Sequence, residues 1–102
     1  MPINNTEIEN VTETKEKLEK PRKYSVVFHN DDFTPMEFVI ELLMLIFNKS
    51  PQAAMVLTEE VHLKGKAIVG EYPKSIAQSK VNEVTEAAKQ NEFPLKCTME
   101  AN

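Results

Sequence analysis

Residues 24–47 have the sequence YSVVFHNDDFTPMEFVIELLMLIF, in which a strand pattern changes to a helix pattern. Over Tyr24–His29, large apolar side chains occupy alternate positions, which is typical of a strand with one face in the core. Thr34 and Pro35 then match a helix start, because threonine suits the N-cap and proline suits the first helical position. The stretch therefore predicts a strand over Tyr24–His29, a short polar turn, and a helix that begins at Pro35.

This first helix is apolar on almost every side over Phe38–Phe47, so we expect it to lie between the sheet and another element. It ends shortly before Ser50 and Pro51, which repeat the pattern of a capping residue followed by proline. A second helix is therefore predicted from Pro51, and Gly65 breaks its apolar spacing.

The rest of the chain predicts three more elements. A β-rich run over Lys66–Tyr72 predicts a strand, Lys74–Gln90 has helical spacing, and apolar residues alternate with polar ones from Leu95 to Met99. The order is βααβαβ with short connections. This order predicts an α+β domain in which three helices pack on one face of a small, three-stranded antiparallel sheet.

Composition and charge limit the class of protein. The chain has 102 residues, of which 41% are hydrophobic, and this fits one compact domain. The net charge of −4 argues against nucleic acid binding, because the phosphate backbone repels an acidic protein that lacks a dense basic patch. A single cysteine excludes a disulfide framework, and the sequence has neither a signal peptide nor a long apolar span. We therefore expect a cytoplasmic monomer that does not bind membranes.

Residues 1–22 differ from the rest because Glu and Lys interleave with Asn and Thr, and apolar residues are sparse. Such a segment buries too little apolar surface to offset the entropy that ordering would cost. We therefore predict a flexible N-terminal tail over residues 1–22 and a folded core domain over residues 23–102.

The polar turn after the first strand carries the clearest chemistry. If the chain stays extended there, Asn30 and Asp32 project to the same side and Asp31 points away. His62, near the end of the second helix, can complete a set of three acceptors. An ammonium group has three N–H donors, and an amide oxygen, a carboxylate and a neutral imidazole each accept one hydrogen bond. The pattern predicts a site for the free N-terminus of a peptide.

Structural explanations of the same residues remain open at this point. Two acids and an amide before Thr34 and Pro35 often form a turn that leads into a helix. A lone histidine such as His62 often interacts with the negative end of its own helix dipole. These explanations require no ligand.

Metal binding and catalysis are weaker interpretations. His29, Asp31 and His62 could in principle bind zinc, but His and Asp without Cys are a weak metal signal. Asp31 and Asp32 are adjacent, so on an extended chain they point apart and do not form a catalytic pair. Cys97 has no acid or histidine at a recognisable spacing and is expected to be a small buried hydrophobe. We expect no enzyme activity, no metal and no cofactor.

Three blocks of sequence resemble ClpS, the adaptor family that delivers N-degron substrates to the Clp AAA+ protease. The blocks are residues 27–39 (VFHNDDFTPMEFV), 61–70 (VHLKGKAIVG) and 93–98 (FPLKCT). They occur in the same order as in the family, and the resemblance covers the whole predicted core domain.

The resemblance implies roles for individual residues. It implies that the α-amino group of a peptide binds Asn30, Asp32 and His62, with Asp31 nearby. The first side chain of that peptide, a Leu, Phe, Tyr or Trp, would enter an apolar pocket. The pocket positions are Thr34, Met36, Val39, Thr58, Val61 and Leu95. Met36 is expected at the rim, where it excludes β-branched side chains, and Thr58 stands where many relatives are expected to have Met.

The resemblance also implies partners. It places docking to the N-terminal domain of the Clp unfoldase around Ser75 and Lys80, although an acid is expected at the position of Ser75. The tail over residues 1–22 is a candidate for the segment that the motor grips. The alternative is a non-catalytic α/β interaction module that does not recognise N-termini, which would explain the fold but not the coincidence of the three amine acceptors.

Overall fold

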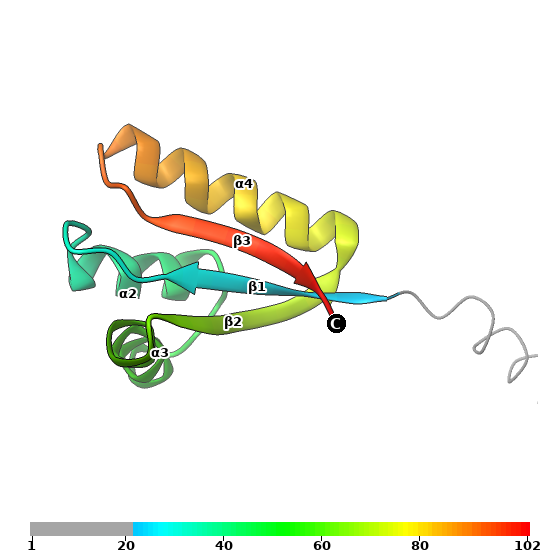
Figure 1. Ribbon diagram of the computed structural model, residues 1–102, viewed down its shortest axis with the longest axis horizontal. Coiled ribbons are helices and arrows are strands. Elements are labelled where there is room, and N and C mark those ends of the chain that lie inside the picture. Colours follow the sequence, from blue (N-terminus) through cyan, green and yellow to red (C-terminus); the bar gives the residue numbers. More distant parts are fainter. Residues whose placement is uncertain (1–21) are drawn as a thin grey trace, which may run out of the picture.

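The computed structural model describes residues 22–102, and the flexible tail predicted over residues 1–22 falls, except for Arg22, on residues outside this range. The elements are β1 (Lys23–His29), α2 (Met36–Leu45), α3 (Pro51–Lys64), β2 (Lys66–Pro73), α4 (Lys74–Gln90) and β3 (Lys96–Ala101) (Figure 1). The predicted order βααβαβ is confirmed.

Strand β1 lies in the middle of the sheet, between β2 and β3, and both pairings are antiparallel. Alternate residues of β1, Val26 and Phe28, belong to one core with buried residues of all three helices, such as Leu43, Ala54 and Val84. The helices therefore pack on the same face of the sheet, as predicted (Figure 1).

A bulge interrupts the pairing of β1 with β2. The register shifts between Ile68 and Gly70, which leaves Val69 as the extra residue. A Cβ on Gly70 would lie 2.6 Å from Cε2 of Tyr72, because the tyrosine ring lies against the glycine backbone. A larger residue at this position would therefore have to displace the Tyr72 ring.

Helix α2 begins one residue later than predicted, at Met36, and Pro35 occupies the N-cap position. Pro35 is extended, with ψ 142°, and makes no side-chain capping hydrogen bond. The prediction that Thr34 caps this helix is wrong, because the Thr34 hydroxyl donates to Oδ2 of Asp31 over 2.8 Å instead. The start of α2 is thus tied to the turn that precedes it.

The outer side of α2 is open to solvent. The helix packs against α3, but Leu45 on its other side is 74% exposed. Helix α2 therefore packs against α3 and the core, as a helix between the sheet and another element would, but within the described residues no element covers the side that carries Leu45.

Helix α3 begins and ends as predicted. The Ser50 side chain accepts a hydrogen bond from Ala53 N over 3.2 Å, and Pro51 fills the first helical position. Gly65 ends the helix in the left-handed conformation, with φ 88°, and its N–H donates to Val61 O.

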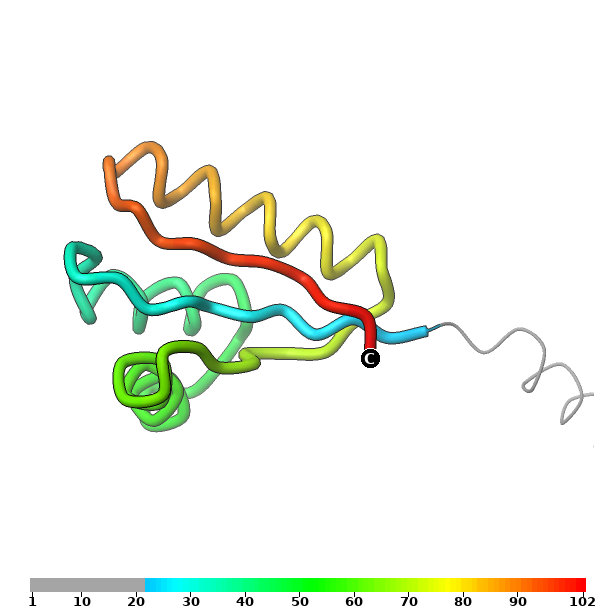
Figure 2. Tube along the Cα trace, viewed as in Figure 1, coloured from blue at the N-terminus to red at the C-terminus, as the bar shows by residue number. Residues whose placement is uncertain are grey.

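Segments that are far apart in the sequence meet at one end of the molecule. In Figure 2 the turn after β1, the C-terminal end of α3 and the turn before β3 lie at the same end, and the C-terminus lies at the other. Among the helices that the structure describes, none has both the length and the apolar character needed to cross a membrane.

Candidate functional site

The turn after β1 is organised by the carboxylate of Asp31. Its Oδ1 accepts hydrogen bonds from the N–H groups of Phe33 (2.8 Å) and Thr34 (2.7 Å). Its Oδ2 accepts the hydroxyl of Thr34 at 2.8 Å. The chain therefore bends over residues 32–34 and does not stay extended, so the condition under which Asn30 and Asp32 were expected to share one side is not met. A side chain that bonds the backbone two and three residues ahead is the usual chemistry of an Asp turn.

These hydrogen bonds set the charge of Asp31. Burial raises the pKa of Asp31, but hydrogen bonds from Thr34 N, Phe33 N and the Thr34 hydroxyl lower it more, so the net pKa lies below the usual aspartate value. At neutral pH Asp31 is therefore a carboxylate that fixes the turn and adds negative charge to it.

One backbone hydrogen bond joins this turn to α3. Asn30 N donates to Gly65 O over 2.8 Å, immediately after the end of the helix. Thr58, Val61 and His62 precede Gly65 at spacings of three to seven residues, so they lie on one face of the helix. This bond therefore positions that face of α3 beside the turn.

The turn, α2, α3 and the residue before β3 enclose a cavity of about 220 Å³. The lining residues are His29, Asn30, Asp31, Asp32, Thr34, Met36, Val39, Thr58, Val61, His62 and Leu95. Asn30, Asp32 and His62 are exposed, whereas the apolar residues Val61 and Leu95 are buried. The cavity thus has a polar rim and a mostly apolar floor.

The structure brings all ten residues that the sequence singled out as amine-binding or pocket residues to this cavity. Asn30, Asp32 and His62, which come from two separate segments, stand at its rim. Met36 is 45% exposed at the start of α2, which agrees with a position at the edge of the cavity. The binding roles of these residues remain a proposal, which is taken up below.

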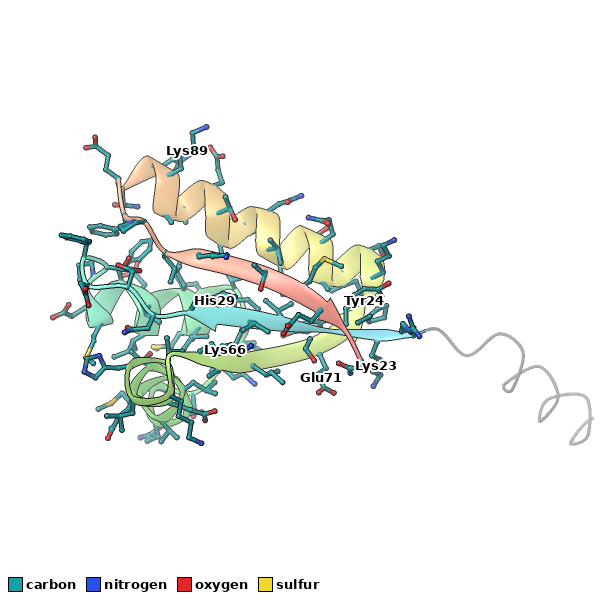
Figure 3. The ribbon with its side chains drawn as sticks, in the orientation of Figure 1. Lys23, Tyr24, His29, Lys66, Glu71 and Lys89 are labelled. Atoms are coloured by element: carbon teal, nitrogen blue, oxygen red, sulfur yellow. The ribbon has the colours of Figure 1, made fainter. Side chains whose placement is uncertain are left out.

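The eleventh lining residue, His29, was considered only as a metal ligand in the sequence. Its Nε2 and Thr98 Oγ1 form a hydrogen bond of 2.8 Å between β1 and β3, and Lys66 and Lys96 pair with it across the sheet. Figure 3 shows His29 on β1 and Lys66 on the neighbouring strand β2. Burial and both lysines lower the pKa of His29, against the opposing effect of Glu100.

The sequence signal that could have placed His29 in the cavity lining is its position directly before Asn30, at the end of the strand. Among residues 22–102, no group of three or more His, Cys, Asp or Glu side chains is arranged to hold a metal ion.

The floor of the cavity contains one buried polar side chain. Thr58 is 5% exposed, and its hydroxyl donates to Ala54 O, one helical turn earlier, over 2.7 Å. The hydroxyl is therefore satisfied without any partner inside the cavity.

The comparisons with known proteins identify the family. Residues 19–98 match the family model described as ATP-dependent Clp protease adaptor protein ClpS. The chain belongs to this family. An ATP-dependent Clp protease adapter protein ClpS of Clostridium acetobutylicum is 53% identical over 85 residues, which is 83% of this chain and 84% of that protein. A protein of the same name from Shewanella pealeana is 48% identical over 94 residues, covering 91% and 92% of the two chains.

A solved structure of the ClpS family has the same fold. The structure of Agrobacterium tumefaciens ClpS2 bound to L-phenylalaninamide superimposes with a TM-score of 0.79 at 35% identity. The match covers 80% of this chain and 99% of that chain. The resemblance to ClpS and the α+β fold that it implied are therefore confirmed.

The two ClpS positions expected to dock an unfoldase lie on α4. Ser75 is exposed at the first turn of the helix. Lys80 is partly buried: its Nζ donates to Ile46 O over 2.6 Å and lies 5.8 Å and 5.6 Å from the ring centres of Phe47 and Tyr72. Lys80 therefore ties the end of α2 to α4, and docking through it remains a prediction.

Cys97 has the structural role that the sequence predicted. It is a buried residue of β3 in the core shared with the helices. Burial raises the pKa of its thiol to about 12. The thiol is therefore protonated at neutral pH, whereas a nucleophile must be a thiolate.

Proposed function

We propose that this chain binds the free N-terminus of a polypeptide whose first residue is large and hydrophobic, and delivers that polypeptide to a Clp AAA+ unfoldase. The observation that carries the proposal is the arrangement of the cavity, in which hydrogen-bond acceptors at the rim stand beside an enclosed apolar floor. An N-terminal residue matches this arrangement, because its ammonium and its side chain are attached to the same Cα. The ammonium can therefore meet the rim while the side chain meets the floor.

The cavity has the volume for one aromatic side chain. An apolar protein cavity of roughly 150 Å³ is known to take up a benzene ring, and the cavity here measures about 220 Å³. Val39, Val61 and Leu95 on its floor are at least nine-tenths buried, so a bound side chain would lose most of its contact with water. A single Leu, Phe, Tyr or Trp side chain fits these limits.

The amine supplies the second half of the recognition. Asn30, Asp32 and His62 offer an amide oxygen, a carboxylate and an imidazole nitrogen to the three N–H donors of an ammonium group. Asp31 already accepts three hydrogen bonds from the turn. We therefore assign Asp31 to positioning the turn and to adding negative charge beside the amine.

Micromolar binding requires both the hydrophobic side chain and the free amine. Burying one Leu or Phe side chain contributes about 1.5 to 3 kcal/mol, and each hydrogen bond to a charged group about the same. A micromolar complex needs about 8 kcal/mol. The side chain alone falls well short of this value, and three hydrogen bonds to the amine reach it only at the top of their range, so an internal Phe or a blocked N-terminus should not bind.

The solved relative agrees with this assignment. L-Phenylalaninamide, the ligand of the Agrobacterium tumefaciens ClpS2 structure, has a free amine and a phenylalanine side chain, and its carboxyl end is an amide like a peptide bond. It therefore represents the first residue of a peptide.

Delivery requires a surface for the unfoldase and a segment for the motor to grip. We assign docking on the unfoldase N-terminal domain to the exposed start of α4 around Ser75, and gripping to residues 1–22. The chain would act in the cytoplasm as a non-catalytic monomer. Deletion of residues 1–22 should leave peptide binding unchanged and slow the degradation of a substrate that begins with Leu; unchanged degradation would contradict the gripping role.

Fluorescence anisotropy with two short peptides tests the binding function. Both begin with Phe and carry a C-terminal fluorophore, but only one is N-acetylated. The free-amine peptide should bind in the micromolar range, and the acetylated peptide should show no measurable binding because acetylation removes the positive charge and two of the three N–H donors that Asn30, Asp32 and His62 would accept. Equal affinities of the two peptides would refute the proposal.

A pair of substitutions controls for general loss of charge. Asp32→Asn removes the rim carboxylate and should weaken binding of the free-amine peptide by about tenfold or more. Glu71→Gln removes an exposed acid near Lys23, at the other end of the sheet from His29 (Figure 3). It should leave the affinity unchanged; an equal loss in both variants would mean that net charge, and not the rim, governs binding.

A further inference from the structure

Thr58 is unusual for a residue on the floor of an apolar cavity. Ser25 and Thr58 are the buried polar or charged side chains of residues 22–102, and Thr58 is the one that lines the cavity. A threonine hydroxyl has one proton to donate and two lone pairs that can accept. The proton of Thr58 is already used, because Oγ1 donates to Ala54 O over 2.7 Å.

Because the Thr58 hydroxyl already donates its proton within the protein, its hydrogen-bonding role toward a ligand is restricted. With its proton directed to the helix backbone, Oγ1 of Thr58 can only accept a further hydrogen bond. Thr34, nearer the rim, is committed in the same way, since its hydroxyl donates to Asp31. Both hydroxyls of the cavity lining therefore favour a ligand side chain that donates a hydrogen bond over one that only accepts.

We propose that Thr58 Oγ1 accepts a hydrogen bond from the side chain of the bound N-terminal residue, and that Thr58 thereby selects tyrosine. This inference rests on the proposed function and names the residue of the cavity that sets preference among aromatic side chains. The phenol of tyrosine is a donor at the far end of an apolar ring, so it reaches the floor when the ring fills the cavity. A buried tyrosine hydroxyl usually has a hydrogen-bond partner, and one without a partner is costly.

The hydrogen bond from Thr58 to Ala54 O could serve only to stabilise α3. This structural role and the proposed specificity role predict different binding results. A structural role changes the affinity for every peptide by the same factor. A specificity role changes the ratio between the affinities for a donor side chain and for an apolar side chain of the same shape.

Three peptides that differ in their first residue separate these cases. The residues are Phe, Tyr and 4-methylphenylalanine, which has a methyl group in place of the tyrosine hydroxyl and so matches its length without a donor. Their affinities are measured by anisotropy with the full chain, with Thr58→Val, which has the same shape without the hydroxyl, and with Thr58→Ser, which keeps the hydroxyl. Circular dichroism and thermal unfolding check that each variant folds.

In the unaltered chain the Tyr peptide should bind about 3- to 10-fold more tightly than the 4-methylphenylalanine peptide, as expected for one hydrogen bond. This ratio should fall to about 1 in Thr58→Val and persist in Thr58→Ser. The same ratio in the unaltered chain and in Thr58→Val would overturn the inference, and so would a ratio of about 1 in the unaltered chain.

The acetylated Phe peptide separates failure of this inference from failure of the proposed function. If the free-amine Phe peptide binds and the acetylated one does not, the proposed function stands whatever the tyrosine ratio. If the unaltered chain binds none of the three free-amine peptides, both the proposed function and the selection of tyrosine are overturned.

Discussion

Replacing Asp31 with alanine tests whether this carboxylate acts by holding the turn. The change removes an acceptor of three hydrogen bonds, from Phe33 N, Thr34 N and the Thr34 hydroxyl. Substituting a side chain that caps backbone N–H groups in this way typically costs about 0.5 to 2 kcal/mol. Because Asp31 is partly exposed and water replaces some of the lost bonds, we expect a cost on the order of 2 kcal/mol in peptide binding.

That cost corresponds to about a 30-fold loss of affinity for the free-amine Phe peptide, measured by anisotropy. Asp31→Asn is the matched control, because its Oδ1 still accepts from Phe33 N and Thr34 N, and its amide can donate to the Thr34 hydroxyl. If Asp31 acts by position, Asp31→Asn should stay within about fivefold of the unaltered chain. If both variants lose affinity equally, Asp31 acts through the attraction between its negative charge and the amine, and the hypothesis that it positions the turn is wrong. Full affinity in Asp31→Ala would refute both roles.

The pH dependence follows from the same hydrogen bonds. They hold the folded-state pKa of Asp31 below its ordinary value of 3.8, so their contribution to stability is fully present above that value and is lost as pH falls through the lower, folded pKa. The free energy of unfolding from denaturant titrations should therefore fall less steeply between pH 4 and pH 2 in Asp31→Asn than in the unaltered chain. The same pH dependence of the free energy of unfolding in both proteins would contradict the stabilising role of the Asp31 carboxylate.

Three further substitutions or reactions test the packing. Lys80→Met keeps the aliphatic stem but removes the hydrogen bond to Ile46 O, and should lower the free energy of unfolding by about 1 kcal/mol in denaturant titrations; no change would mean that the bond is not significant. Gly70→Ala puts a Cβ against the Tyr72 ring and should lower the free energy of unfolding by about 1 to 3 kcal/mol in the same titrations; no change would mean that the ring moves aside freely. Cys97, with a thiol pKa of about 12, should resist alkylation at pH 8 in the native protein and react after denaturation, as mass spectrometry would record.

Local sequence rules predicted the elements because several of them agree at each boundary. Ser50 and Pro51 begin α3, and Gly65 ends it in the left-handed conformation that glycine favours. The alternation along β1 predicted that Val26 and Phe28 face the helices, although Ser25 and Val27 on the other face are buried as well. These signals act within a few residues of the chain, so they are visible without the fold.

The internal arrangement of the candidate site was not visible in the same way. Asp31 turns back on Thr34 because its carboxylate bonds two N–H groups ahead, whereas an extended chain was the simplest expectation. Thr34 could cap α2 or bond Asp31, and the choice depends on the geometry of the turn. The committed proton of Thr58 likewise depends on a side-chain rotamer, which sequence spacing does not specify.

The walls of the cavity come from the end of β1 and the turn after it, from α2, from α3 and from Leu95 before β3. An unfolded chain cannot assemble this set, so a ligand binds the native state alone and draws the folding equilibrium toward it. At a hundredfold excess over its dissociation constant, a peptide adds about 2.7 kcal/mol to the free energy of unfolding. The melting temperature of the domain is therefore itself a readout of which N-terminal residues it accepts, and a label-free thermal screen can rank them.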